Sequence, residues 1–324
     1  MLNSEWDKSY GQPHREKKVD LNMIIAMTTP GALFLSSFMP AVLGVILSAE
    51  QSAHLPVSMV ICLLLIPTLM NASVDVLNDY YDYVSGNDTT ENVVSEIDGP
   101  LAYHHVRNPR PALYAGLAFM LLALLLGCYV ILHAGWIPLL IGGFGAMIAL
   151  TYSGKFISTS HLPIGEFLSG FTLGGLVPLG VFVSLTGKID LWVLWKSIPM
   201  MLIVSQFMLS NNTCDMERDK EAGRVTLSIL IGRERAEKLA RKIMIFWILQ
   251  IFLVLIIRYP AGVPVMLFFL LWQRKSLKRT FSYHMTHEDK NSATLTLAKV
   301  ALAIALGYPL SVLTGILVNR CLSV

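Results

Sequence analysis

Charged residues are scarce in this chain. Among its 324 residues, Asp, Glu, Lys and Arg make up 15% and hydrophobic residues 54%, and the mean hydropathy is +0.58. Soluble globular domains carry about 25% charged residues. The composition therefore argues against a water-soluble protein and in favour of one embedded in a membrane.

Several sequence signatures are also missing. The four cysteines have no paired spacing, so the sequence predicts neither a disulfide framework nor a cysteine zinc site; they are Cys62, Cys128, Cys214 and Cys321. His104-His105 and His284 with His287 fall short of the three or four ligands that zinc requires. No Ser-His-Asp set, P-loop or dinucleotide fingerprint is visible. The net charge of +3 comes without a basic patch interleaved with aromatics, so no nucleic-acid partner is expected.

Long uncharged runs are what the sequence has instead. A helix needs roughly 20 apolar residues to cross a bilayer, and about nine segments approach or exceed this length. The sequence thus predicts an all-α polytopic membrane protein of about nine transmembrane helices, of which the eighth is short. The predicted spans are 22–48, 54–77, 111–133, 135–152, 163–185, 190–210, 239–257, 260–273 and 295–318.

The distribution of positive charge fixes the predicted orientation. With the N-terminal segment 1–21 in the cytosol, 20 of the 25 Lys and Arg residues fall on the cytosolic side, as the positive-inside rule requires. The opposite side receives only Lys188, Arg258 and Arg320. We expect an integral protein of a bacterial cell membrane, with a first span that is retained because it is longer than a signal-peptide core.

Two acidic clusters lie where predicted spans end. Asn78-Asp79-Tyr80-Tyr81-Asp82, with Asp88 beyond it, follows the second span, and Asn211-Asn212 with Asp215 and Asp219 ends the sixth. Ionisable groups next to hydrocarbon are costly and usually functional. The matching positions predict a single domain, 1–324, of two pseudo-repeated helical halves around a central cavity. Glycines of the middle spans fit close helix packing: Gly142, Gly143, Gly145, Gly170, Gly174 and Gly175.

The spacing within the clusters favours metal binding. If the second span continues as a helix, Asp75, Asn78, Asp79 and Asp82 share one face, and Asp215 and Asp219 are likewise one turn apart. Carboxylate and amide oxygens prefer hard cations, and Mg²⁺ in particular binds through one or two carboxylates together with substrate phosphates. We therefore expect a Mg²⁺ site and a phosphorylated substrate. The alternative is that these are solvated carboxylates paired with neighbouring Arg residues.

Both clusters resemble the signature motifs of the UbiA superfamily of intramembrane prenyltransferases. The tyrosine-rich form of the first motif and the Gly-Arg-x-Thr-Leu tail of the second are similar to those of the 1,4-dihydroxy-2-naphthoate prenyltransferases of menaquinone synthesis. The residues that carry the resemblance are Asn78-Asp79-x-x-Asp82 with Ser85-Gly86-Asn87-Asp88, and Asn211-Asn212-x-x-Asp215-x-x-x-Asp219 with Gly223-Arg224-x-Thr226-Leu227 and Gly232-Arg233.

The resemblance implies an enzyme that binds a polyprenyl diphosphate through Mg²⁺ and transfers the prenyl group to an aromatic acceptor. By position, Mg²⁺ would be held by Asn78, Asp82, Asp215 and Asp219, with Asp79 as a further catalytic residue. Substrate contacts would come from Asp88, Tyr152, Lys155, Asn211, Asn212 and Arg224. The prenyl tail is expected to lie between helices, in a cavity open to membrane lipid.

Other residues have a second explanation. Arg107, Arg110 and Arg224 can clamp phosphate oxygens, although all three are equally well explained as orientation charges. Lys155 is similar to a diphosphate-binding lysine of the family, or it is a lysine extended toward the membrane surface. Glu166 resembles a family Gly-Glu pair, or it caps its helix.

The acceptor remains open at this point. Segment 89–110 lacks the Gly-rich stretch of the naphthoate enzymes. The acceptor is then a naphthoate, or else a hydroxybenzoate, another phenol, a haem-type macrocycle or a glycerol phosphate. A cation-coupled transporter is the third hypothesis, but transporters place ionisable residues at the bilayer midplane, whereas here they cluster at span ends.

Overall fold

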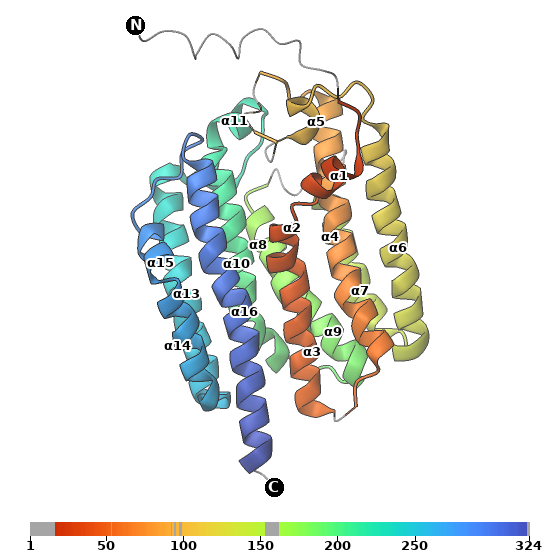
Figure 1. The fold of residues 1–324 in the computed structure, drawn as a ribbon, viewed down its shortest axis with the longest axis vertical. Coiled ribbons are helices and arrows are strands. Elements are labelled where there is room, and N and C mark those ends of the chain that lie inside the picture. Colours follow the sequence, from red (N-terminus) through yellow and green to blue (C-terminus); the bar gives the residue numbers. More distant parts are fainter. Residues whose placement is uncertain are drawn as a thin grey trace, which may run out of the picture.

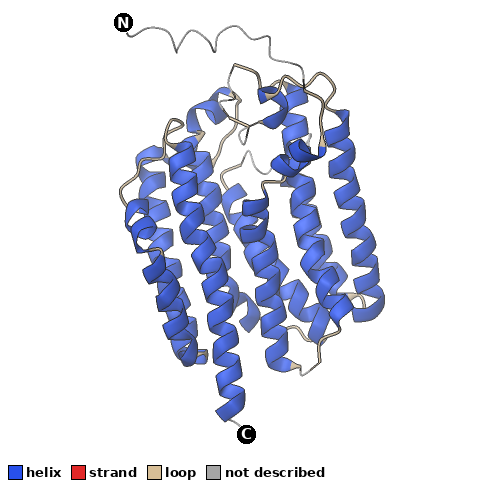
Figure 2. Cartoon of the chain, viewed as in Figure 1, coloured by secondary structure: helices blue, strands red, loops and turns tan. Residues whose placement is uncertain are grey.

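The computed structural model describes residues 17–52, 54–91, 93, 95–96, 99–152 and 162–322. Within these ranges the chain forms helices and loops and no strand (Figure 2). The helices are α1 (Leu21–Met27), α2 (Pro30–Leu33), η1 (Phe34–Phe38), α3 (Met39–Gln51), α4 (Val57–Ser85), α5 (Pro100–Tyr103), α6 (Arg110–Ala134), α7 (Ile137–Tyr152), α8 (Gly165–Ser169), η3 (Gly170–Leu176), α9 (Val177–Thr186), α10 (Trp192–Cys214), α11 (Met216–Glu221), α12 (Leu227–Ile231), α13 (Arg233–Arg258), η4 (Pro260–Gly262), α14 (Val263–Trp272), α15 (Arg274–Thr280) and α16 (Lys290–Leu322).

The predicted all-α membrane fold is confirmed. In the described part, seven helical stretches are long and apolar enough to cross a membrane. Two shorter apolar helices, Ile137–Thr151 and Pro260–Trp272, lie at the fourth and eighth predicted spans. The long helices run side by side, with α4 and α6 on one flank of the bundle and α13 and α14 on the other (Figure 1).

Three of the predicted spans are not continuous α-helices, and one of them, the eighth, begins with the 3₁₀ turn η4. The first is interrupted because Thr29, directly before Pro30, has a left-handed φ of 43°. A proline disfavours the helical conformation in the residue before it and is itself well accommodated at a helix start. The chain therefore turns between α1 and α2. The first and fifth spans also each contain a π-helical stretch, η1 and η3.

The glycines of the middle spans serve two different purposes. A Cβ on Gly174 would lie 2.3 Å from the Met201 backbone nitrogen, and one on Gly170 would lie 2.4 Å from the Met201 carbonyl oxygen. These glycines let η3 approach α10 closely, as predicted. Gly142 and Gly143, by contrast, have nothing within 4 Å of such a Cβ and line a cavity. The packing prediction was wrong for these two.

Both acidic motifs lie at the same end of the bundle. The first ends α4, and the second spans the end of α10 and α11. Both α5 and α11 are at this end of the bundle, while α16 ends at the other (Figure 1). One buried hydrophobic cluster holds residues of η1, α3, α9, α10, α13, α14 and α16. The helices on both sides of the second motif therefore share a core.

Candidate active site

A cavity of about 1130 Å³ runs from the acidic end into the apolar part of the bundle. Its apolar wall includes Leu63, Pro67 and Met70 of α4, Ile141 of α7, Leu173 of η3 and Leu302 of α16. Its polar end is formed by Asn78, Asp79, Asn211, Asn212, Asp215, Asp219, Arg224, His287 and Lys290. The predicted central cavity thus exists. It is bordered by Asn78 and Asp79 of the first motif and by Asn211, Asn212, Asp215 and Asp219 of the second.

The first motif is presented by a helix that continues past the apolar segment. Because α4 extends to Ser85, Asn78 and Asp82 are one turn apart, and the Asn78 Nδ2 donates to Asp82 Oδ2 at 3.0 Å. Gly86, with φ of 81°, ends the helix in the left-handed region. The Asn87 Nδ2 then donates to Asp82 Oδ1 at 3.0 Å. The predicted helical continuation is confirmed, although Asp82 is not among the described residues that line the cavity.

The second motif turns at the end of α10. Asp215 lies between α10 and α11, and the Asp219 backbone N–H donates to the Asp215 carbonyl at 2.8 Å, so the two carboxylates are one helical turn apart as predicted. Asp219 is 4% exposed. Burial raises the pKa of Asp219 to about 6, and the nearby Arg224 charge opposes this rise. The Arg224 guanidinium beside this carboxylate therefore favours its ionised form.

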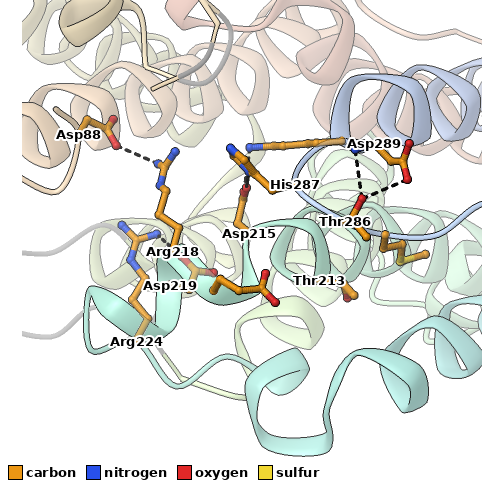
Figure 3. A network of polar contacts seen from close by, with 12 residues as sticks. Asp88, Thr213, Asp215, Arg218, Asp219, Arg224, Thr286, His287 and Asp289 are labelled. Atoms are coloured by element: carbon orange, nitrogen blue, oxygen red, sulfur yellow. Dashed lines mark hydrogen bonds and ion pairs between the residues drawn. The ribbon is translucent and has the colours of Figure 1, made fainter. Parts of the chain in front are cut away.

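Arg224 joins the two motifs. Its Nη2 donates to Asp82 Oδ1 at 3.0 Å, and its Nη1 donates to Asp219 Oδ1 at 3.2 Å. A second link is formed by the Arg218 Nη2, which donates to Asp88 Oδ1 at 2.8 Å (Figure 3). The carboxylates of the two motifs are therefore no farther apart than one guanidinium group can span.

Two residues near the start of the last helix complete this network. The Lys290 Nζ donates to Asp215 Oδ2 at 2.8 Å, and the His287 Nδ1 lies 3.4 Å from Asp215 Oδ1 (Figure 3). The sequence predicts Lys290 only as one of the 20 cytosolic Lys and Arg residues, and His287 only as part of an incomplete zinc set. No local signal could have revealed them, because their contact depends on how α16 packs against α10.

The donor set fits a hard cation that shares its ligands with phosphate. The side chains at the polar end offer amide and carboxylate oxygens, the ligand type Mg²⁺ prefers, and Asp82, Asp215 and Asp219 already attract the cationic groups of Arg224 and Lys290. Within the described residues, however, no group of three or more His, Cys, Asp or Glu side chains could hold a metal by itself. Further ligands must therefore come from amides, water or a substrate.

The remaining predicted site residues lie in different places. Asn211 and Asn212 border the cavity, and the Asn212 Nδ2 donates to Glu166 Oε1 at 2.8 Å, so Glu166 positions this amide. Arg107 and Arg110 are exposed and are not among the cavity-lining residues. Lys155 and the side chain of Tyr152 lie outside the described residues.

Comparison with known proteins identifies the family of this chain. The model of the UbiA prenyltransferase family matches residues 37–285. The 1,4-dihydroxy-2-naphthoate octaprenyltransferase of Bacillus subtilis is 32% identical over 233 residues, covering 72% of this chain and 73% of that protein. The human UbiA prenyltransferase domain-containing protein 1 is 25% identical over 205 residues, covering 61% of this chain and 58% of that protein.

Solved structures share the fold. A UbiA homolog from Archaeoglobus fulgidus bound to GPP and Mg²⁺ has a TM-score of 0.58 at 17% identity, covering 90% of this chain and 99% of that one. A UbiA homolog from Aeropyrum pernix K1 has a TM-score of 0.59 at 14% identity, covering 89% and 98%. Since the family model matches most of the chain, the chain belongs to the UbiA prenyltransferase family and is an integral membrane prenyltransferase.

Proposed function

We propose that the enzyme transfers a polyprenyl group from a polyprenyl diphosphate to 1,4-dihydroxy-2-naphthoate, as in menaquinone biosynthesis. The observation that carries this proposal is one continuous cavity with apolar walls and a polar end built from both acidic motifs. Such a cavity suits a substrate that has an isoprenoid tail and a diphosphate head.

The polar end supplies what a diphosphate leaving group needs. Asn78, Asp82, Asp215 and Asp219 would hold Mg²⁺, and the A. fulgidus homolog was solved with Mg²⁺ and GPP. Mg²⁺, when bound, supplies positive charge for the diphosphate as it departs. Arg224 lies at the same end, where its guanidinium donates to Asp82 and Asp219, and it can likewise donate to phosphate oxygens.

Other residues support this arrangement. Asp79, Asn211 and Asn212 border the polar end and are proposed to orient the diphosphate or its metal. Asp88 is proposed to act through Arg218, to which it is ion-paired. From the family resemblance, Tyr152 and Lys155 are proposed as further substrate contacts.

The apolar wall accounts for the prenyl tail. Each CH₂ group transferred from water to an apolar environment contributes about 0.8 kcal/mol, so the tail favours the cavity and the surrounding membrane lipid over water. With the tail held in the bundle, the first prenyl carbon and the diphosphate lie at the polar end. The acceptor ring then has to approach from that end, where surrounding loops can keep water away from a carbocation.

The proposed acceptor and the proposed membrane location of the enzyme each rest on one observation. A naphthoate is favoured because the B. subtilis relative is named for that acceptor and is 32% identical over most of the chain. We further propose that residues 1–324 act as one domain in a bacterial cell membrane, with segment 1–21 and the active site on the cytosolic side. The asymmetry of 20 against three Lys and Arg residues supports this orientation.

An acceptor panel tests the proposal. Purified protein is incubated with Mg²⁺, labelled polyprenyl diphosphate and, separately, 1,4-dihydroxy-2-naphthoate, a hydroxybenzoate, a simple phenol, a haem-type macrocycle and a glycerol phosphate. The proposal expects a prenylated naphthoate product that disappears when Mg²⁺ is chelated. Transfer to another acceptor with none to the naphthoate would contradict the acceptor assignment.

A further inference from the structure

The segment between α15 and α16 is fixed against the second motif. Met285 is 2% exposed and belongs to a buried cluster with Leu209 and Cys214 of α10. Its backbone N–H donates to Glu237 Oε1 at 2.9 Å, and its carbonyl accepts from Arg233. Ala293, three residues after Lys290, is buried in the same cluster. These contacts before and after Lys290 hold it beside the end of α10.

Lys290 brings a positive charge to the polar end of the cavity. Its ammonium group lies 2.8 Å from Asp215 Oδ2, and both side chains are about four-fifths buried, with exposures of 20% and 18%. Lys290 lines the cavity together with Asp215, Asp219 and Arg224. The chain thus places a lysine from its last helix next to a carboxylate proposed to hold Mg²⁺.

One carboxylate oxygen cannot serve the ammonium and a metal equally well. A metal on Asp215 would repel the Lys290 ammonium, whereas a diphosphate bound to that metal would bring several anionic oxygens within reach of the same flexible side chain. Charge-assisted bonds to phosphate are among the strong ones. Lys290 is therefore poised to exchange Asp215 for a diphosphate oxygen.

We propose that Lys290 is a diphosphate-contacting residue whose ion pair with Asp215 competes with the metal for that carboxylate. This assignment rests on the proposed function of the site. It predicts that removing the Lys290 charge affects the two ligands differently. Diphosphate should bind more weakly, whereas the metal alone should bind as tightly as before or more tightly. A lysine that merely holds the loop in place would, when lost, weaken both.

Binding measurements on the purified full-length protein test this. Calorimetric titration with inorganic pyrophosphate in Mg²⁺ is compared with titration by Mn²⁺ alone for wild type, Lys290→Gln and Lys290→Arg. Loss of one charge-assisted bond corresponds to roughly tenfold to a hundredfold in affinity. In Lys290→Gln the affinity for pyrophosphate should fall by this factor and the affinity for Mn²⁺ should not fall. Lys290→Arg should retain most of the affinity for pyrophosphate.

Lys278→Gln is the matched control, because it removes the same charge from an exposed position on α15 and should bind pyrophosphate like wild type. If Lys290→Gln bound pyrophosphate as tightly as wild type, the role assigned to Lys290 would be wrong, and the proposed function would be unaffected. Parallel loss of pyrophosphate and Mn²⁺ binding would overturn it in favour of a structural role. Absence of pyrophosphate binding in wild type would overturn the proposed function as well.

Discussion

Single residues decide whether the two motifs can act together. Arg224 contacts a carboxylate from each motif. Burial disfavours its charge, but Asp82 and Asp219 together raise the pKa of Arg224. The guanidinium therefore stays charged where two carboxylates would otherwise repel each other.

Loss of a single motif carboxylate should abolish prenyl transfer. Asp82→Ala and Asp215→Ala each remove a charged group from the proposed Mg²⁺–diphosphate site, and losing such electrostatic stabilisation costs on the order of a hundredfold or more. Turnover is measured with labelled polyprenyl diphosphate, and membrane insertion by recovery in the membrane fraction, which should be unchanged.

Glu288→Ala is the control for these variants, because Glu288 is exposed in the loop before α16, and its activity should stay within about twofold of wild type. If either motif variant kept more than about a tenth of wild-type activity, direct ligation by that carboxylate would be contradicted.

Residue-level prediction succeeded where the signal was local. The spacing of Asn78 and Asp82, and of Asp215 and Asp219, needed only the 3.6-residue helical repeat. The partners of these residues did not follow, because the ion pairs of Arg218 with Asp88 and of Lys290 with Asp215 join segments 130 and 75 residues apart. Such contacts depend on tertiary packing, which no local spacing encodes.

At the scale of helices, hydropathy placed the spans but not their internal hydrogen bonding. Apolar length alone located the seven long apolar helices of the described part and its two shorter apolar helices. It could not show that η1 and η3 shift to π-helical bonding, because an inserted π-turn leaves the apolar character unchanged. Both stretches border the cavity, through Phe34 to Ser36 and through Thr172 and Leu173.

The close approach of η3 to α10 should tolerate no added atom. In Gly174→Ala the new Cβ would lie within 2.5 Å of backbone atoms of Met200 and Met201, so the helices must separate. Overpacking of this kind costs about 1–3 kcal/mol. The expected result is a clear drop in the thermal unfolding temperature of the detergent-solubilised protein. Gly143→Ala, which meets no atom within 4 Å, serves as the control, and equal stability of the two variants would refute the packing argument.

For the whole molecule, the cavity is the feature that sets which substrates fit. Gly142 faces open space at its wall, so Gly142→Phe should shorten the space for the tail while leaving the polar end intact. We expect activity with long polyprenyl diphosphates to fall at least about tenfold relative to a short one, by analogy with other losses of shape complementarity. Competition between long and short diphosphates measures this ratio, with Gly142→Ala as the conservative control. An unchanged ratio would mean that the tail does not pass Gly142.

The central claim is that the motifs ending α4 and α10 form one diphosphate site, and a double-mutant cycle tests it most directly. Mg²⁺-dependent pyrophosphate binding is measured by calorimetry for wild type, Asp82→Asn, Asp215→Asn and the double variant. Residues that act on one shared ligand give strongly non-additive losses. The account predicts that the double variant has about the same pyrophosphate affinity as whichever single variant binds pyrophosphate less tightly. Losses that multiply, as they do for independent sites, would contradict it.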